Sequence, residues 1–264
     1  MSIEKKTKLN HLMRNWPDGE IKSSVWLNAE GYGPNLIQKY KSNNWIEAIG
    51  TGAFKKSGDE VKWAAALECL QKQLNSEVHI GGKTAIEFAG KAQYVKMKET
   101  NVVVLSNQKE ALPTWMKKHN WNVRLDFKVK NLFKSSLTFG EKSNGFTVVD
   151  IDKASIIVSA AERAYLEYLD DLPKSSSYNE AKEIMENMIS LRPSMVKHLL
   201  ENCNSIKVKR LFLHLAEKIN HPWFKKLTLE KIDLGSGKRV IFENGVLDKK
   251  YNITVPKDDS YEEV

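Results

Sequence analysis

The sequence contains little cysteine and no long apolar run. Its 264 residues include only two cysteines, Cys69 and Cys203, and each stands alone inside a helix-like pattern, which predicts two buried thiols. No stretch approaches the roughly 18 apolar residues that a membrane-spanning helix needs, so we expect no membrane segment. The basic start of the chain is not followed by an apolar core, which argues against a signal peptide and predicts a cytoplasmic protein.

Residue clusters that carry catalysis or bind metals are also missing. No cysteine or histidine group has metal-ligand spacing, so we expect no structural zinc. His79, His214 and His221 have no evident serine, cysteine or carboxylate partner, which favours histidines of the core or the surface. A nuclease is the less favoured alternative, because paired carboxylates beside a lysine are not found. The sequence therefore predicts a protein that is not an enzyme.

Three local motifs invite chemistry, and each has a plainer structural interpretation. Residues 81–84 resemble the end of a phosphate-binding loop but lack its earlier glycine, which favours a tight turn before a helix over nucleotide binding. Asp170 and Asp171 could hold a metal, but two acids at a helix end before Pro173 are more typical of a cap or a solvated surface. Residues 235–239 could bind phosphate, although a β-turn with solvated charges is favoured.

What the sequence does contain is a basic first part. The net charge is +8, and residues 1–150 hold 23 Lys and Arg against 15 Asp and Glu, whereas residues 151–264 hold 18 of each. A polyanionic partner is therefore expected on the first 150 residues. Charge alone does not establish such a partner, because many basic proteins bind no nucleic acid.

Residues 1–75 have the pattern of a winged helix-turn-helix. The expected helices lie at residues 3–15, 25–30, 34–42 and 61–74. The expected hairpin, or wing, has strands at residues 45–49 and 53–56. Gly31 can end the second helix and Pro34 fits the first turn of the third, so the two short helices are joined by a tight turn. Two short helices joined in this way are typical of a helix-turn-helix.

The third helix and the wing carry polar and basic side chains that suit DNA. Asn and Gln can pair bidentately with adenine, while Lys contacts guanine or phosphate, and the start of the third helix would lie nearest the base edges. The wing can contact DNA phosphates, and such contacts fix the position of the protein on the duplex. The candidate DNA contacts are Ser23, Tyr32, Asn35, Gln38, Lys39, Lys41, Thr51, Lys55 and Lys56. A winged helix that docks a protein is the alternative, and the polar, basic third helix favours DNA.

Residues 76–264 predict a larger domain of mixed α and β structure, so the fold class of the chain is α+β. The expected strands lie at residues 78–80, 102–105 and 121–133 and in a hairpin over residues 146–158. The expected helices lie at residues 83–90, 160–172, 178–191, 193–202 and 206–218, and residues 112–118 are expected to form a short turn or helix. Residues 227–255 are expected to form strands, with Asn244 and Gly245 as a hairpin turn. Lys207, Lys209 and Arg210 start the last helix, where a solvated face is favoured over an interaction surface.

Blocks spread along nearly the whole chain resemble one protein family. They include GYGPNLIQKY (residues 31–40), GTGAF (50–54), VHIGGKTAIEFAG (78–90), LPTWMKK (112–118), KVKRLFLHLAEKINHPWF (207–224), LGSGKRVI (234–241) and KKYNITVP (249–256). In this order they resemble the AbiEi-type antitoxins of bacterial type IV toxin–antitoxin systems. The C-terminal blocks are the more specific part, since a winged helix by itself would not single out a family.

The resemblance implies two roles. The N-terminal winged helix would bind inverted repeats in the promoter of its own operon and repress it, as a monomer or weak dimer that binds DNA cooperatively. The C-terminal domain would counter an AbiEii-like nucleotidyltransferase toxin without a stable complex, in abortive infection that defends against phage. No cofactor is implied. The alternative is a stand-alone transcriptional regulator whose C-terminal domain senses a ligand or a protein.

Within the matching blocks, clustered charge suggests where the toxin is countered. The hypothesised antitoxicity surface consists of Lys207, Lys209, Arg210, Lys238 and Arg239. Charge alone motivates this hypothesis, because the C-terminal blocks contain no recognisable catalytic group.

Overall fold

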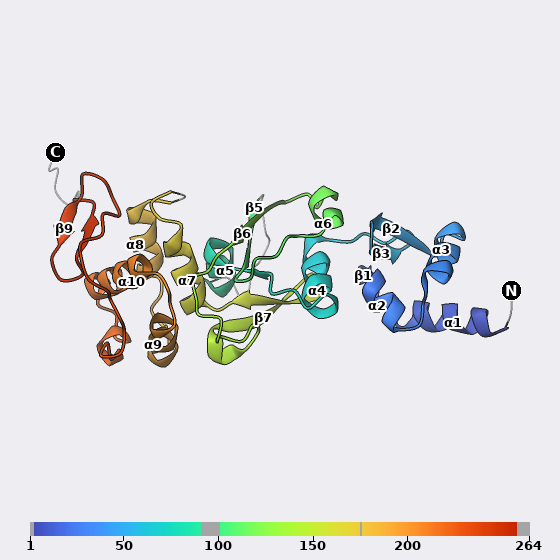
Figure 1. Ribbon diagram of the computed structural model, residues 1–264, viewed down its shortest axis with the longest axis horizontal. Coiled ribbons are helices and arrows are strands. Elements are labelled where there is room, and N and C mark those ends of the chain that lie inside the picture. Colours follow the sequence, from blue (N-terminus) through green and yellow to red (C-terminus); the bar gives the residue numbers. More distant parts are fainter. Residues whose placement is uncertain (1–2, 91–100, 175, 258–264) are drawn as a thin grey trace. The chain divides into compact units, whose positions relative to one another are not determined.

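The structure of the chain, a computed structural model, describes residues 3–90, 101–174 and 176–257 (Figure 1). The chain forms two compact units. The first contains residues 1–79, 98–127 and 148–157, and the second contains residues 80–97, 128–147 and 158–264. The expected boundary at residue 75 lies inside the first of these units, which also includes two later segments of the chain.

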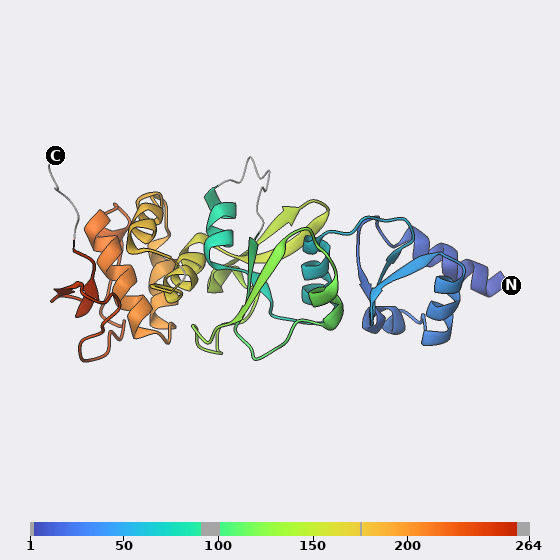
Figure 2. The same cartoon turned by 90° about the horizontal axis from the view of Figure 1, so that it is seen from above.

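A small sheet and three short helices form the start of the first unit (Figure 2). The elements are α1 (Ile3–Arg14), β1 (Lys22–Ser23), α2 (Ser24–Ala29), α3 (Pro34–Ser42), β2 (Ile46–Gly50) and β3 (Ala53–Lys56). The strands pair antiparallel in the order β1-β3-β2. Helices α2 and α3 are the predicted helix-turn-helix, and β2 and β3 are the predicted wing. Strand β1 was not predicted, because two residues carry no readable alternation.

Local signals set the ends of α2 and α3. Ser23 caps α2, since its Oγ accepts a hydrogen bond from the backbone N of Trp26 at 3.0 Å. Gly31 has a φ of 81°, a left-handed conformation that favours glycine and that ends α2. Pro34 occupies the first turn of α3, where its missing N–H costs nothing.

The apolar side chains of this winged helix meet in one core. Its buried members are Leu9, Leu12, Trp16, Leu27, Tyr32, Ile37, Tyr40, Ile46 and Phe54. On α3 the inward residues Ile37 and Tyr40 are three positions apart, which leaves the opposite face of the helix to solvent. Full burial of one large apolar side chain stabilises a fold by about 1.5–3 kcal/mol, so this core holds α3 firmly in place.

A five-stranded sheet follows along the chain. Its strands are β4 (His79–Ile80), β5 (Asn101–Ser106), β6 (Arg124–Val129), β7 (Phe146–Ile151) and β8 (Ala154–Ser159). Their order is β6-β5-β4-β8-β7, and β4 runs parallel to β8 with Ile80 opposite Val158. The predicted strands and the predicted hairpin over residues 146–158 thus correspond to observed elements.

Two further helices, α4 (Trp63–Gln73) and α6 (Thr114–Lys118), complete the first unit. Gln71 of α4 shows why this unit extends beyond residue 75. Its Nε2 donates to the carbonyl oxygens of Val78 at 2.8 Å and Ile157 at 3.0 Å, and its Oε1 accepts from the backbone N of Ile157 at 2.8 Å. One buried amide therefore satisfies three backbone groups, which ties residues 148–157 to α4.

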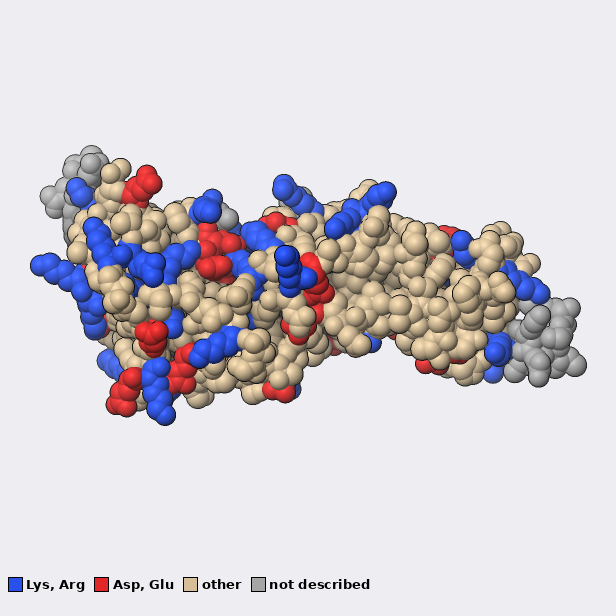
Figure 3. Space-filling model, viewed as in Figure 1, with Lys and Arg blue, Asp and Glu red and all other residues tan. Residues whose placement is uncertain are grey.

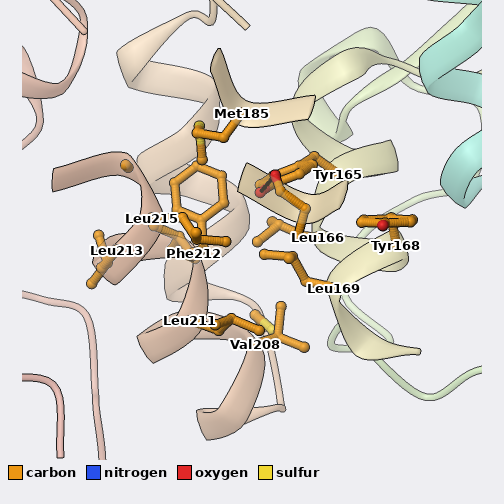
Figure 4. Close-up of a cluster of buried hydrophobic side chains, with 14 of the residues drawn as sticks. Tyr165, Leu166, Tyr168, Leu169, Met185, Val208, Leu211, Phe212, Leu213 and Leu215 are labelled. Carbon is orange, nitrogen blue, oxygen red and sulfur yellow. Dashed lines mark hydrogen bonds between the residues drawn. The ribbon is translucent and has the colours of Figure 1, made fainter. Parts of the chain in front are cut away.

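The second unit is mainly helical. Its helices are α5 (Gly82–Gly90), α7 (Ala161–Asp170), α8 (Tyr178–Glu186), α9 (Pro193–Glu201) and α10 (Ile206–Ile219), with 3-10 turns η1 (Lys142–Asn144) and η2 (Phe224–Lys226). Tyr165, Leu166 and Leu169 of α7 point toward Leu211 and Phe212 of α10 in the core (Figure 4). Across the described ranges, none of the helices combines the length and apolarity needed to span a bilayer. The α+β prediction is confirmed.

The hairpin near the C-terminus differs from the prediction. Its strands are β9 (Val246–Asp248) and β10 (Ile253–Val255), so Asn244 and Gly245 precede the hairpin. The chain turns at Asn244, whose φ is 59°, but the prediction that this turn joins the two strands is wrong. Asp248 makes the actual turn, because its Oδ1 accepts from the backbone N of Lys250 at 2.8 Å and of Tyr251 at 3.0 Å.

Candidate nucleic-acid interface

Helix α3 presents the predicted recognition residues outward. Asn35 and Gln38 are exposed, and Lys39 and Lys41 are partly exposed in its last turn. None of the ion pairs among the described residues involves either lysine. The helix therefore offers two neutral amides and two uncompensated positive charges on one solvent-facing side. This combination suits base reading beside phosphate contacts.

Two predicted DNA contacts, Ser23 and Tyr32, are buried instead of presented to solvent. Ser23 is 1% exposed, its hydroxyl caps α2, and its backbone N donates to Oε1 of Gln73 at 2.7 Å. Tyr32 is 4% exposed, and its hydroxyl lies 3.1 Å from Nδ1 of His11. Burial raises the pKa of Tyr32. Both side chains hold the helices in place, and we remove them from the contact set.

The lysines of the wing are held in ion pairs. Nζ of Lys55 lies 3.1 Å from Oε2 of Glu47 and donates to the carbonyl oxygen of Asp59 at 2.7 Å, and Lys56 pairs with Asp18. The hydrogen bond from Lys55 holds the pKa of Glu47 below its usual value, and the bond from Lys56 does the same for Asp18. The wing therefore offers less uncompensated charge than its sequence indicates.

At the tip of the wing, Thr51 is exposed as predicted. The next residue, Gly52, accepts a hydrogen bond at its carbonyl oxygen from the backbone N of Ser24 at 2.8 Å. This hydrogen bond ties the tip to the start of α2, the first helix of the motif, which in a helix-turn-helix crosses the DNA backbone. Thr51 is therefore adjacent to a residue that contacts the start of α2.

In the second unit, the hypothesised basic strip is largely buried. Lys209 and Arg210 are 4% and 3% exposed. Nζ of Lys207 donates to the carbonyl oxygens of Asp170 at 2.6 Å and Leu172 at 2.9 Å, and burial lowers the pKa of Lys207. The expectation that these three cations form a solvent-facing strip is wrong. Helical spacing alone does not reveal that Lys207 and Arg210 donate to backbone carbonyl oxygens of other segments, or that Lys209 is buried.

Arg210 organises the segment that contains Lys238 and Arg239. Its guanidinium donates to four carbonyl oxygens, those of Leu234 at 2.7 Å, Gly235 at 3.0 Å, Gly237 at 2.7 Å and Asn252 at 3.1 Å. Lys238 and Arg239 follow directly and are exposed. Of the hypothesised antitoxicity surface, these two residues alone are fully available to a partner.

Within residues 81–84, Gly82 begins α5, and its backbone N–H points to the buried carboxylate of Glu167. The backbone N of Gly82 donates to Oε2 of Glu167 at 3.2 Å, and the same carboxylate accepts from Ser159 Oγ at 2.8 Å and Arg163 Nε at 2.9 Å. Glu167 thus occupies the helix start, where a bound phosphate would need the free N–H groups. The tight-turn interpretation fits this arrangement better than nucleotide binding.

His214 is a buried histidine, as expected, but it has a carboxylate partner that the sequence did not reveal. Nε2 of His214 lies 2.7 Å from the hydroxyl of Tyr178, and Nδ1 lies 2.5 Å from Oδ2 of Asp248, so His214 does have a carboxylate partner. Asp248 lies on β9, 34 residues along the chain, and only the folded hairpin brings it to α10. His79 and His221 instead contact backbone carbonyl oxygens at 3.0 and 2.9 Å.

The adjacent acids Asp170 and Asp171 are engaged with lysines. Nζ of Lys130 lies 2.7 Å from Asp171 Oδ1 and 3.4 Å from Asp170 Oδ2, and Nζ of Lys128 lies 3.1 Å from Asp171 Oδ2. In the described part of the chain, no three His, Cys, Asp or Glu residues are grouped as metal ligands. Cys69 and Cys203 are free and buried, as predicted, and burial raises their pKa to about 12 and about 11.

Comparisons with known proteins bear on both units. Residues 5–97 match a family model described as the N-terminal domain of an AbiEi antitoxin transcriptional regulator, and residues 99–256 match one described as an AbiEi antitoxin transcriptional regulator of a type IV toxin–antitoxin system. No curated protein matches the chain. The solved structure of the RV2827C protein from Mycobacterium tuberculosis aligns with a TM-score of 0.51 at 10% identity, covering 96% of this chain and 91% of that one. At this identity the likeness concerns the fold alone.

Proposed function

The chain belongs to the AbiEi family of antitoxin transcriptional regulators of type IV toxin–antitoxin systems, and we propose that its winged helix represses its own operon by binding inverted repeats in the promoter. The observation that carries this proposal is the solvent-facing side of α3. Asn35 and Gln38 stand there beside two lysines without acidic partners among the described residues.

The side chains of α3 contact different parts of the DNA in this proposal. Asn35 and Gln38 read base edges in the major groove, since an amide can donate to and accept from adenine at the same time. Lys39 and Lys41 contact phosphates and set the register of the helix without reading sequence. Thr51 at the wing tip adds a contact to the backbone of the neighbouring groove.

An inverted repeat presents two half-sites related by twofold symmetry. Each half-site receives the α3 helix of one chain, so two chains occupy the promoter. Two monomers that bind cooperatively meet this requirement as well as a weak dimer does.

A gel-shift series on the DNA directly upstream of the coding sequence tests this proposal. Gln38→Ala and Asn35→Ala remove base contacts, and we expect each to lower discrimination between promoter and scrambled duplex by about 1–3 kcal/mol. Lys39→Ala and Lys41→Ala are the matched variants that remove phosphate contacts. We expect them to weaken binding to both duplexes equally and to reduce the salt dependence of binding. Unchanged binding in all four variants would remove α3 as the recognition helix.

For the second role we propose that the C-terminal part of the chain counters an AbiEii-like toxin without forming a stable complex with it. Lys238 and Arg239 are the residues we expect to act, because they are exposed on a segment that Arg210 holds in place. In this proposal the chain itself needs no cofactor and catalyses no reaction.

Rescue of growth from the co-expressed toxin tests this second role. The double variant Lys238→Glu and Arg239→Glu reverses the exposed charge, and we expect it to lose rescue while still binding promoter DNA. The control double variant, Lys225→Glu and Lys226→Glu, reverses the charge of another exposed pair. Full rescue by the first variant, or equal loss in both, would contradict the assignment.

A further inference from the structure

Helix α6 lies directly against the wing in the first unit. It packs on strand β2, and a Cβ placed on Gly50 would lie 2.7 Å from Cβ and 3.1 Å from Cα of Trp115. Real Cβ atoms do not approach other atoms so closely, so the glycine permits the contact. Gly50 is the last residue of β2, next to Thr51 at the wing tip.

The short helix is anchored on its inner side. Trp115 and Met116 are 4% and 1% exposed, and Nε1 of Trp121 donates to the carbonyl oxygen of Met116 at 2.7 Å. The rings of Trp115 and Trp121 pack edge to face with centroids 6.4 Å apart. A helix fixed in this way presents its remaining side chains in a defined direction.

Those remaining side chains are basic. Lys117 and Lys118 form the last turn of α6 and are exposed, and the described ion pairs include neither of them. In the space-filling view, Lys and Arg side chains stand out over the position of α6, beside a largely uncharged surface (Figure 3). Lys117 and Lys118 follow Trp115 by two and three residues, so both belong to the same helical turn as the residue that contacts β2.

The pKa of His119, the residue after α6, gives a second indication that α6 lies near the wing. Burial lowers the pKa of His119, and the positive charge of Lys55 on β3 lowers it further. The end of α6 therefore lies within electrostatic range of the wing. Because Lys55 and Lys56 are paired with Glu47 and Asp18, the uncompensated positive charge beside the wing comes from α6.

We propose that Lys117 and Lys118 of α6 contact DNA phosphates beside the wing, as a backbone-binding element outside the winged helix itself. The inference rests on the proposed DNA binding. Successive phosphates of one strand are spaced by about 3.4 Å along the helix axis, so two adjacent lysines on flexible four-carbon stems can reach neighbouring phosphates. Such contacts add affinity and carry no sequence information.

The salt dependence of binding by the full chain tests the proposal. Affinity for the promoter duplex and for a scrambled duplex is measured between about 50 and 200 mM salt. For the double variant Lys117→Ala and Lys118→Ala, we expect the slope of log K against log salt to become shallower by about 1.8, since each lost phosphate contact accounts for about 0.9. We expect affinity on the order of tenfold weaker for both duplexes, with the preference for the promoter unchanged.

The control is the double variant Lys225→Ala and Lys226→Ala, which removes the same charge from another exposed pair. The proposal is overturned if the α6 variant has the same salt slope as the unaltered chain. It is also overturned if both double variants lose the same amount of affinity and slope. If the unaltered chain prefers its promoter and the Asn35 and Gln38 variants lose that preference while the salt slope of the α6 variant stays unchanged, this inference alone fails. If the unaltered chain binds neither duplex, the proposed function fails with it.

Discussion

At the scale of single residues, two groups of basic side chains in this protein differ in what they contact. Arg210 and Lys207 donate to backbone carbonyl oxygens and hold segments of the second unit together. Lys39, Lys41 and the α6 lysines face solvent, and no ion pair among the described residues involves them. Ligand binding is therefore expected from the second group, whereas substitutions in the first group are expected to change stability.

Arg210→Ala tests this division directly. The substitution removes four hydrogen bonds to carbonyl oxygens, of which only that of Asn252 keeps another donor among the described residues, the backbone N of Arg239, and we expect a loss of about 3 kcal/mol in the free energy of unfolding. Chemical denaturation followed by circular dichroism measures the loss. Arg239→Ala is the matched control, because Arg239 is exposed and its removal should change stability by less than about 0.5 kcal/mol. Equal stabilities of the two variants would show that the four bonds contribute little.

Glu162 makes part of the stability depend on pH. Burial would raise its pKa, but hydrogen bonds from Arg192 outweigh burial and hold the pKa of Glu162 below its ordinary value. Nε and Nη2 of Arg192 each donate to a different carboxylate oxygen at 2.9 Å. A carboxyl group whose folded pKa is depressed stabilises the fold above its unfolded pKa, about 4.3, and loses that contribution as pH falls through the folded pKa.

Glu162→Gln is therefore expected to melt below the unaltered chain at neutral pH. The difference in melting temperature should be constant well above the unfolded pKa of about 4.3 and shrink as the pH falls below it toward the lower folded pKa, because protonation of the carboxylate removes its stabilising contribution. Thermal melts at several pH values measure this, with Glu243→Gln as the exposed control. A difference that stays constant over this range would show that the ion pair is not its source.

Single-residue roles were only partly predictable from the sequence. The outward placement of Asn35 and Gln38 followed from the helical period, because Ile37 and Tyr40 mark the buried side. Burial of Arg210 did not follow, because its carbonyl partners lie 24 to 42 residues away along the chain. The partnership of His214 with Asp248 was missed for the same reason. Contacts between distant segments leave no local pattern.

At the scale of elements, the wing is supported from outside the winged helix. Helix α6 packs against β2, and from the sequence residues 112–118 were expected to form local structure and to match the family, with no contact to the wing foreseen. The wing of this protein therefore depends on a segment more than 50 residues further along the chain, which a boundary at residue 75 would remove.

Gly50→Ala is expected to disturb this contact. The added methyl group would lie 2.7 Å from Cβ of Trp115, so we expect a loss of about 1–3 kcal/mol in stability from overpacking. Gly90→Ala is the matched control, since nothing lies within 4 Å of a Cβ there and the residue closes a helix. Comparable stability of both variants in denaturant unfolding would contradict the close packing of α6 on the wing.

Element boundaries were predictable where their signals are local. Helix α3 occupies the predicted residues, because Pro34 fixes its start by its own backbone geometry. The hairpin at the C-terminus was misplaced, since Asn244 and Gly245 offer a strong turn pattern while the carboxylate of Asp248 forms the turn actually used. A turn pattern indicates where the chain can turn, whereas strand pairing decides which turn joins the two strands of a hairpin.

At the scale of the whole molecule, charge is divided unevenly along the chain. Residues 1–150 carry the entire net charge of +8, and residues 151–264 are balanced. The part with excess charge contains the winged helix and α6, which together make up the proposed DNA-binding surface. We therefore expect salt to weaken DNA binding strongly, because released counterions supply much of the affinity of a basic surface.

The central claim is that this antitoxin reads its own promoter. The most direct test is a fluorescence anisotropy titration of the unaltered full chain against the promoter duplex and a scrambled duplex of equal length, at about 0.15 M salt. We predict that the promoter duplex binds at least about a thousandfold more tightly, the lower end of the range for specific regulators. Equal affinities for the two duplexes would contradict the account.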